Sequence, residues 1–114
     1  MAKQYALLIY GSEDGGWDEL SAEEKAAQTQ VYMDIFRDDR TKTGAELDEL
    51  STATTVRVKD GEALTTDGPF AETKEYLGGL YIVECENLDE ALEIAARIPA
   101  AQRGAVEVRP VIEH

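Results

Sequence analysis

The chain is poor in the residues that carry most metal, redox and disulfide chemistry. Its 114 residues include one cysteine, Cys85, and one histidine, His114. A single cysteine cannot close a disulfide within the chain, so we expect a reducing, cytoplasmic location. No set of Cys and His residues has zinc spacing, and the acidic clusters lack the alternating ligands and glycine of a calcium loop. We therefore expect neither a metal nor a cofactor.

Basic residues are also scarce. Lys and Arg number 11 against 24 Asp and Glu, which gives a formal net charge of −13. Phosphate recognition needs clustered Lys and Arg, so this charge argues against direct binding to nucleic acid and against docking on anionic lipid. The chain also has no apolar run near the roughly 18 residues of a membrane span, and no secretory h-region follows Met1. We expect no membrane contact.

What is present is the composition of an ordinary globular domain. Hydrophobic residues make up 43% of the chain and charged residues 31%. Such a chain can bury about two-thirds of the surface that its unfolded form exposes. A domain usually holds roughly 100–200 residues, so we expect residues 1–114 to form one domain.

Apolar and β-branched runs predict strands along the chain. Three such runs lie at residues 4–10, 77–86 and 106–112. Two further runs, 53–59 and 62–66, are separated by Asp60-Gly61. A two-residue Asp-Gly connection is a strong hairpin signal because both turn positions need positive φ. These runs therefore predict three strands and one β-hairpin.

Two segments predict helices. The first begins after Ser21, which opens a capping box, and is expected to run to about Lys42 and end near Gly44. The second follows Asn87, a favourable N-cap, and ends before Pro99.

The first predicted helix has a broad apolar face that contains one polar residue. Gln28 projects near the middle of this face, which is otherwise made by Ala27, Val31, Tyr32, Ile35 and Phe36. Gln28 is either a partly exposed edge position or a polar group aimed into a pocket.

The order strand, helix, strand hairpin, strand, helix, strand is typical of an α+β ferredoxin-like sandwich. We expect an antiparallel sheet with two helices on one face, plus an extra β-hairpin. The other face carries Tyr, Val and Leu side chains that need a cover, and a second copy of the chain is the simplest one. The sequence therefore predicts a homodimer packed sheet to sheet.

The segment 66–75 is the most informative stretch of the chain. It lies between two predicted strands and is longer than a hairpin requires. Gly68 permits unusual φ values and Pro69 stiffens the next bond, so the backbone is held in one shape. The loop could be a functional site or a structural turn with a solvated charge run. The charged side chains that it presents include Asp67, Glu72 and Lys74.

Residues 66–79, with the sequence TDGPFAETKEYLGG, resemble the hallmark of the DGPF-domain branch of the YCII-related family. Further resemblance lies at residues 51–57, 97–101 and 106–111, and the loop around Trp17 also fits. The resemblance extends over nearly the whole chain, with four motifs in the same order.

The resemblance implies a dimeric α+β barrel of ferredoxin-like protomers, related to muconolactone-isomerase-like proteins. DGPF proteins resemble small proteins associated with extracytoplasmic-function sigma factors, and a more distant relative type acts as a dehydrochlorinase on chlorinated hydroxyquinols. A His–Asp pair has been proposed as catalytic in the wider family. This chain departs there, because its one histidine is the terminal His114.

Without a suitable histidine, acid–base chemistry falls to Asp67 or Glu72. Lys74, Arg57 and Arg109 are candidate charge partners. Phe70 could desolvate a neighbouring carboxylate, which general acid–base catalysis favours. Alternatively, Asp67 accepts backbone amides within the Gly-Pro turn, and Arg57 pairs with a glutamate across the sheet instead of holding an anionic ligand.

Tyrosines are the other candidate ligand contacts. Tyr32 and Tyr81 could line a cavity between the sheet and the helices, where their hydroxyls would orient a ligand, or they could be ordinary core residues. Cys85 lies between two glutamates whose charge opposes a thiolate, so we expect no nucleophile there. With Asp67 as the candidate catalytic base, the candidate ligand-binding residues are Gly68, Pro69, Phe70, Glu72, Lys74, Tyr32, Tyr81 and Arg57.

Three hypotheses follow for the function. The first is a small-molecule enzyme of lyase, isomerase or dehalogenase type with its pocket near Asp67. The second is a non-catalytic module that senses a metabolite or contacts a regulatory protein such as a sigma factor. The third is an accessory dimer without a ligand. The leading hypothesis is a dimer that binds a small molecule near Asp67, and the sequence leaves open whether it is an enzyme.

Overall fold

The structure, a computed structural model, describes residues 2–12, 16–71 and 73–114. Its body is one four-stranded sheet in the order β2-β5-β1-β6, and each neighbouring pair is antiparallel. This strand order, with helices after the first and third strands of the body, is consistent with the predicted ferredoxin-like sandwich. The body strands are β1 (Lys3–Ser12), β2 (Thr41–Glu46), β5 (Glu75–Cys85) and β6 (Ala105–Pro110).

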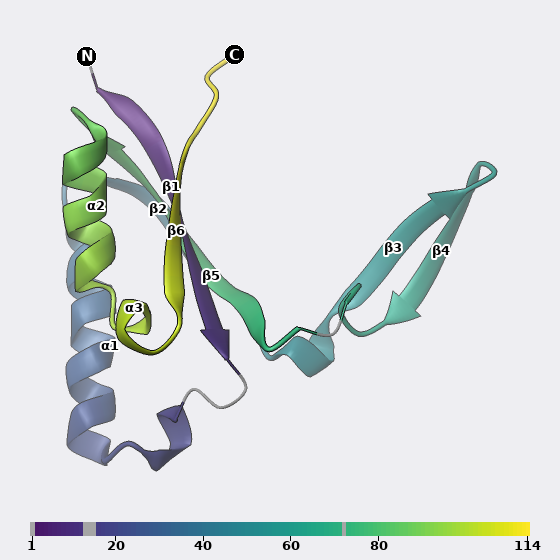
Figure 1. The fold of residues 1–114 in the computed structure, drawn as a ribbon, viewed down its shortest axis with the longest axis horizontal. Helices are drawn as coiled ribbons and strands as arrows, with labels where there is room; N and C mark the ends of the chain where they lie inside the picture. Colours follow the sequence, from purple (N-terminus) through teal and green to yellow (C-terminus); the bar gives the residue numbers. More distant parts are fainter. Residues whose placement is uncertain (1, 13–15, 72) are drawn as a thin grey trace.

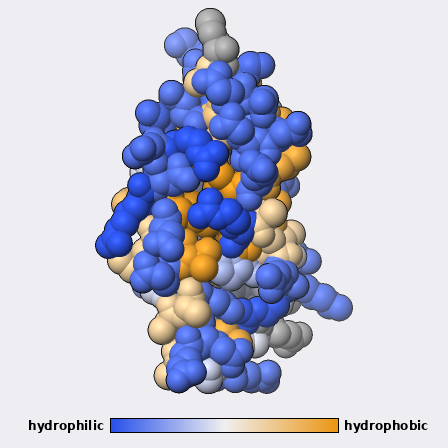
Figure 2. Space-filling view, turned by 90° about the vertical axis from the view of Figure 1, so that its left-hand side faces the viewer, coloured by the Kyte–Doolittle hydropathy of each residue, from blue (hydrophilic) through white to orange (hydrophobic). Residues whose placement is uncertain are grey.

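The helices lie on one face of this sheet (Figure 1). The α-helices are α1 (Ala22–Arg37), α2 (Leu88–Arg97) and the short α3 (Ala100–Arg103), and the 3-10 turns are η1 (Trp17–Glu19) and η2 (Leu50–Thr52). Figure 2 shows the helix-covered side, where hydrophilic side chains dominate and apolar atoms are visible between them. None of the helices in the described ranges is both long and apolar enough to cross a membrane.

The core lies between these helices and the sheet. Side chains alternate along each strand, so the register that pairs Tyr5 with Val83 and Leu7 with Tyr81 places all four on the helix side. Ile35 of α1 and Ile94 of α2 complete the layer from the other side, and both are fully buried. The buried apolar residues are Tyr5, Leu7, Ile35, Tyr81, Val83, Cys85, Ala91, Ile94, Ala95 and Ile98.

The opposite face of the sheet is open. Ala6 and Leu8 of β1 lie beside Ile82 and Leu80 of β5 on this face. None of the described segments covers these four side chains, and they remain half-buried between their neighbours. We call this surface the open sheet face.

The predicted hairpin forms and stands apart from the body. Strands β3 (Thr54–Lys59) and β4 (Glu62–Asp67) make a separate two-stranded sheet. Asp60 and Gly61 have φ values of 52° and 80°, as the predicted Asp-Gly turn requires. Figure 1 shows the hairpin extending away from the helices. Residues 54–67 are called the arm below.

The first helix is shorter than predicted. It ends at Arg37, residues 38–40 form a turn, and β2 begins at Thr41, where the helix was expected to continue to about Lys42. Asp38 leaves the helix in an extended conformation, and the Thr41 hydroxyl donates to the carbonyl of Ile35 at 2.6 Å. The helix stops here because these local bonds satisfy its last turn. The segment then joins the sheet by pairing with β5.

Candidate functional site

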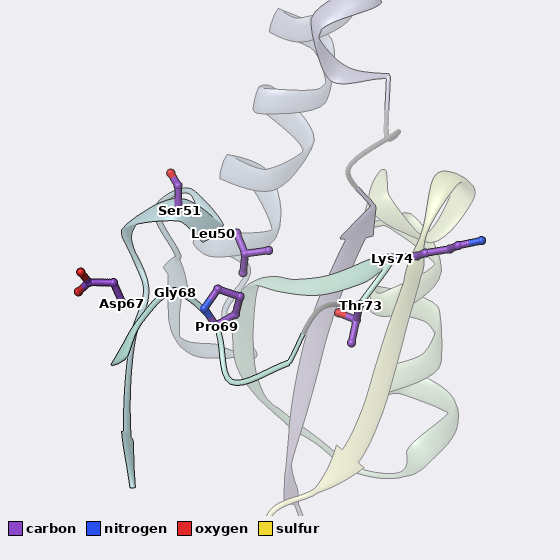
Figure 3. A pocket seen from close by; sticks show the side chains of 7 residues that line it. All are labelled: Leu50, Ser51, Asp67, Gly68, Pro69, Thr73 and Lys74. Atoms are coloured by element: carbon purple, nitrogen blue, oxygen red, sulfur yellow. The ribbon is translucent and has the colours of Figure 1, made fainter. Parts of the chain in front are cut away.

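The loop that follows the arm borders a shallow hollow of about 710 Å³. Figure 3 shows Asp67 and Lys74 on opposite sides of it, both directed outward, with Leu50, Pro69 and Thr73 between them. The two charged groups therefore do not converge on one point. The lining residues are Leu50, Ser51, Asp67, Gly68, Pro69, Thr73 and Lys74.

The backbone of this loop closes the base of the arm. The Gly68 amide donates to the carbonyl of Ala53 at 2.7 Å, and the Thr55 hydroxyl donates to the carbonyl of Gly68 at 2.7 Å. Gly68 has a φ of 99°, which residues with a Cβ rarely adopt. Asp67 is exposed, and its carboxylate has no hydrogen bond or ion pair with the residues that the structure describes. Gly68 is therefore required for the backbone conformation of the loop, whereas the Asp67 carboxylate faces solvent.

The remaining candidates near the loop are dispersed. Phe70 is 77% exposed and lines neither this hollow nor the pocket described next. Arg57 lies on the arm, paired with Leu64, and is also absent from both. Glu72 lies outside the described residues. The structure therefore brings together Asp67, Gly68, Pro69 and Lys74 but not Phe70 or Arg57.

A second pocket, of about 780 Å³, lies between α1 and one end of the sheet. Tyr32 and Tyr81 both line it, so these two candidates share a cavity that is separate from the Asp67 loop. We call it the aromatic pocket. Its lining includes the aromatic residues Trp17, Tyr32, Phe36, Tyr76 and Tyr81, the apolar residues Ile9, Met33 and Ala100, the polar residues Gln28, Thr29, Arg37 and Glu46, and the glycines Gly11, Gly44, Gly78 and Gly79. Ala45 and Leu80 also border it, although strand alternation directs their side chains to the open sheet face.

Glycines create the floor of this pocket. Gly79 pairs with Ile9 and Gly44 pairs with Tyr81, so both occupy helix-facing positions of the sheet without filling them. A Cβ on Gly44 would lie 2.7 Å from Cδ1 of Tyr81, and one on Gly79 would lie 2.8 Å from the carbonyl oxygen of Ala45. Larger residues would therefore clash as well as occupy the space beneath α1.

The two pocket tyrosines are held in place and remain protonated. The Tyr81 hydroxyl donates to the carbonyl of Tyr32 at 2.9 Å. Burial raises the pKa of Tyr81 to about 12, with smaller contributions from Tyr32 and Glu46. Burial likewise raises the pKa of Tyr32, although a backbone hydrogen bond from Ala100 opposes the shift. At neutral pH both phenols are therefore hydrogen-bonding groups and not bases.

The rim combines large apolar side chains with a few polar ones. Phe36 is 55% exposed and Trp17 44% exposed, and the ammonium of Lys25 lies 5.8 Å from the centre of the Trp17 ring. Gln28 was expected to be either a partly exposed edge position or a polar group near a pocket. It is both, because it is half-buried and lines the pocket. Sequence patterning placed Phe36 on the apolar face of the helix but did not assign it to a pocket. The sequence feature that could have indicated this pocket is the set of glycines in β2 and β5, which leave space beneath the helix.

Other reactive chemistry is limited. In the described ranges, no three His, Cys, Asp or Glu side chains gather where they could hold a metal ion. Cys85 is buried, and burial raises the pKa of its thiol, with Glu90 adding to the shift. The arrangement thus offers an apolar cavity with hydrogen-bonding groups at its edge.

Comparison with known proteins agrees with the sequence motifs at the family level. The model of the YCII-related domain matches residues 4–114. An uncharacterized protein of Rhizobium meliloti (strain 1021) is 39% identical over 117 residues, which cover 94% of this chain and 90% of that protein. The family match spans nearly the whole chain, so the chain belongs to the YCII-related family.

Proposed function

We propose that this protein binds a small, flat and largely apolar molecule in the aromatic pocket. The observation that carries the proposal is the pocket itself: five aromatic side chains surround a floor of glycines beneath α1. Ligand sites are typically concave and apolar, with a small number of polar groups that fix orientation. The Asp67 hollow has fewer apolar walls, and its charged groups point away from it.

The polar groups of the pocket indicate what the ligand carries. Gln28 offers both a donor and an acceptor, while Arg37 and Glu46 have opposite charges. The whole chain has a net charge of −13, which disfavours a strongly anionic ligand. A neutral aromatic compound with one polar end fits these groups best.

The protonation of the phenols argues against the two pocket tyrosines as general bases, whereas the Glu46 carboxylate also lines the pocket. A lyase- or isomerase-like step needs a group that accepts a proton from the ligand. Tyr32 and Tyr81 hold their protons at neutral pH because burial raises both pKa values. A lyase- or isomerase-like activity near Asp67 is a more specific hypothesis than ligand binding. It is tested after a ligand has been identified.

The alternative function is a non-catalytic module that contacts a sigma factor or another regulatory protein. It is supported by the exposure of Trp17, Met33 and Phe36 at the rim of the pocket. Exposed apolar side chains that cluster are typical of protein-binding surfaces as well as of ligand sites. The experiment below separates the two.

The test uses Trp17, the single tryptophan of the chain, as a reporter at the rim of the pocket. N-phenyl-1-naphthylamine, an uncharged aromatic probe, is titrated against the wild-type protein while Trp17 emission is followed. Phe36→Ala removes a side chain from the rim of the pocket and should weaken probe binding roughly 5- to 30-fold, the effect of losing one aromatic contact. Phe70→Ala is the matched control, because Phe70 is equally large, exposed and outside the pocket.

Two results would count against the proposed site. If Phe70→Ala and Asp67→Ala weaken binding while Phe36→Ala does not, the ligand binds at the Asp67 hollow. If wild-type protein shows no saturable change in Trp17 emission with this probe or related neutral aromatics, the regulatory-protein alternative is preferred.

We also propose that the functional unit is a homodimer packed through the open sheet face. Support comes from Ala6, Leu8, Leu80 and Ile82, four apolar side chains on a face that no described segment covers.

Within the family, the run Asp67-Gly68-Pro69-Phe70 supports membership of the DGPF branch. The unpaired thiol of Cys85 supports a cytoplasmic location.

A further inference from the structure

The arm buries almost nothing of its own. Each of its residues except Thr55 is exposed, including Val56 at 60% and Val58 at 72%. A two-stranded hairpin without further packing is marginally stable in water. We therefore expect the arm to be stabilised by packing against another surface.

The two faces of the arm differ in chemistry. Strand pairing places Val56 opposite Thr65 and Val58 opposite Ala63, which makes the outer part of one face uncharged and apolar. Thr54 and Asp67 share this face at the base of the arm. The other face carries the charged residues Arg57, Lys59 and Glu62, together with Leu64. Such alternation is typical of strands with one face packed and one face in water. The face with Val56 and Val58 is the one that should be covered.

The accessible surface area of the chain is larger than that of a compact monomer of the same mass. A monomeric protein of 12.5 kDa exposes about 6,200 Å², whereas this chain exposes 8347 Å². Its radius of gyration is 16.1 Å, against about 13 Å for a compact domain of this length. A standard interface buries about 800 Å² per partner. The excess is therefore enough for a dimer interface larger than the standard one.

The position of the arm indicates which partner covers it. Figure 1 shows that the arm leaves the body on the side away from the helices, which is the side of the open sheet face. We propose that the apolar face of the arm, formed by Val56, Val58, Ala63 and Thr65, packs against a second copy of this chain. A copy seated on the open sheet face would lie next to the arm, and two-fold symmetry would apply the same contact twice.

Charge also favours the arm as a contact between copies. Each chain carries a net charge of −13, so two bodies repel each other. The four residues of the apolar arm face are uncharged, and residues 54–67 as a whole carry two basic and three acidic side chains, a net charge of −1. The arm therefore offers one of the less repulsive surfaces for self-association. This inference rests on the homodimer proposed above and does not depend on the ligand proposed for the aromatic pocket.

The experiment compares two substitutions that add the same charge to opposite faces of the arm. Val58→Asp places a carboxylate on the apolar face, and Leu64→Asp places one on the charged face. Mass is measured over a range of protein concentrations by sedimentation and by light scattering after gel filtration. We expect a wild-type dimer, a rise of at least about tenfold in the dimer dissociation constant for Val58→Asp, and near-wild-type behaviour for Leu64→Asp.

A second variant removes the arm. The Gly68 amide and the Ala53 carbonyl are 2.7 Å apart, so a short glycine turn can replace residues 54–67 without moving the body. This variant should keep the circular dichroism of the folded body and lose most of the dimer. The proposal is overturned if wild-type protein is monomeric, if arm removal or Val58→Asp leaves the dimer intact, or if both aspartate variants dissociate it equally.

Discussion

At the scale of single residues, one ion pair fixes the exit from α1. Arg40 donates to both carboxylate oxygens of Asp38, at 3.0 Å from Nε and 2.9 Å from Nη2. A further ion pair joins Arg40 to Glu90 at 3.6 Å. The Arg40 hydrogen bonds lower the pKa of Asp38 from 3.8 to about 2. This turn directs the chain from the helix into β2.

The first prediction concerns the acid stability that this pair contributes. A carboxylate whose pKa is lower in the folded state stabilises the fold above its unfolded pKa and loses that contribution as the pH falls. The loss should therefore occur between about pH 4 and pH 2. Asp38→Asn should cost about 1 kcal/mol at neutral pH, because the partly exposed pair is screened by solvent.

Thermal unfolding midpoints against pH provide the measurement. The gap between wild type and Asp38→Asn should narrow as the pH falls through this range. Asp39→Asn removes the same charge from the neighbouring residue and is the control. A gap that stays constant down to pH 2 would contradict the assigned role.

The second prediction concerns the glycine floor of the aromatic pocket. Gly44→Ala would place a methyl group 2.7 Å from the Tyr81 ring and 3.3 Å from the carbonyl oxygen of Leu80. We expect it to destabilise the protein by about 1–3 kcal/mol through overpacking. Gly11→Ala, also at the pocket but with nothing within 4 Å of its Cβ, is the control. Urea denaturation of both variants measures the difference, and equal midpoints would rule out the tight contact.

At the scale of elements, helix starts were readable from local sequence. Ser21 accepts from the Glu24 amide at 3.1 Å, and the Glu24 carboxylate accepts from the Ser21 amide at 3.2 Å, which completes the predicted capping box. The Asn87 side chain accepts from the Glu90 amide at 3.0 Å, as expected for its N-cap. These bonds form between residues three apart, so the sequence contains all their determinants.

The third prediction follows from the capping box. Ser21→Ala should destabilise the protein by about 1 kcal/mol, because the first-turn amides of α1 lose their acceptor. Thr29→Ala removes another hydroxyl from the same helix and should be neutral or stabilising, since Ala has the higher helix propensity. Chemical denaturation compares the two. A Ser21→Ala variant as stable as wild type would show that the cap contributes nothing.

Strand β2 shows where local sequence is insufficient. The residues Thr41–Glu46 have no apolar alternation, and helix signals precede them. Their strand conformation depends on pairing with β5, including Gly44 opposite Tyr81 and Ala45 opposite Leu80. Because the paired residues of β5 lie more than thirty positions further along the chain, no pattern within the segment predicts this pairing.

At the scale of the whole molecule, the dominant feature is an acidic body with an exposed arm and an open sheet face. Apolar contact between copies must overcome repulsion between net charges of −13. The balance between these two effects should respond to salt, since screening shortens the range of the repulsion without weakening apolar contact.

The fourth prediction is therefore that salt strengthens the proposed dimer. Raising NaCl from about 20 mM to about 500 mM should lower the dimer dissociation constant several-fold, as the Debye length falls well below the size of the protein. Sedimentation equilibrium at both salt concentrations provides the measurement. Dissociation at high salt would instead indicate an interface held by ion pairs, such as contacts of Arg57 and Lys59.

The sequence by itself determined the elements whose signals are local: the capped starts of α1 and α2, the Asp-Gly hairpin, and the alternation that gives the sheet a helix-facing side. It also determined the family, through motifs such as residues 66–79. Only the tertiary structure separated Tyr32 and Tyr81 from Asp67, because their positions depend on how α1 crosses the glycines of β2 and β5. Contacts of this kind join residues distant in sequence, and they form only when the whole sheet is assembled.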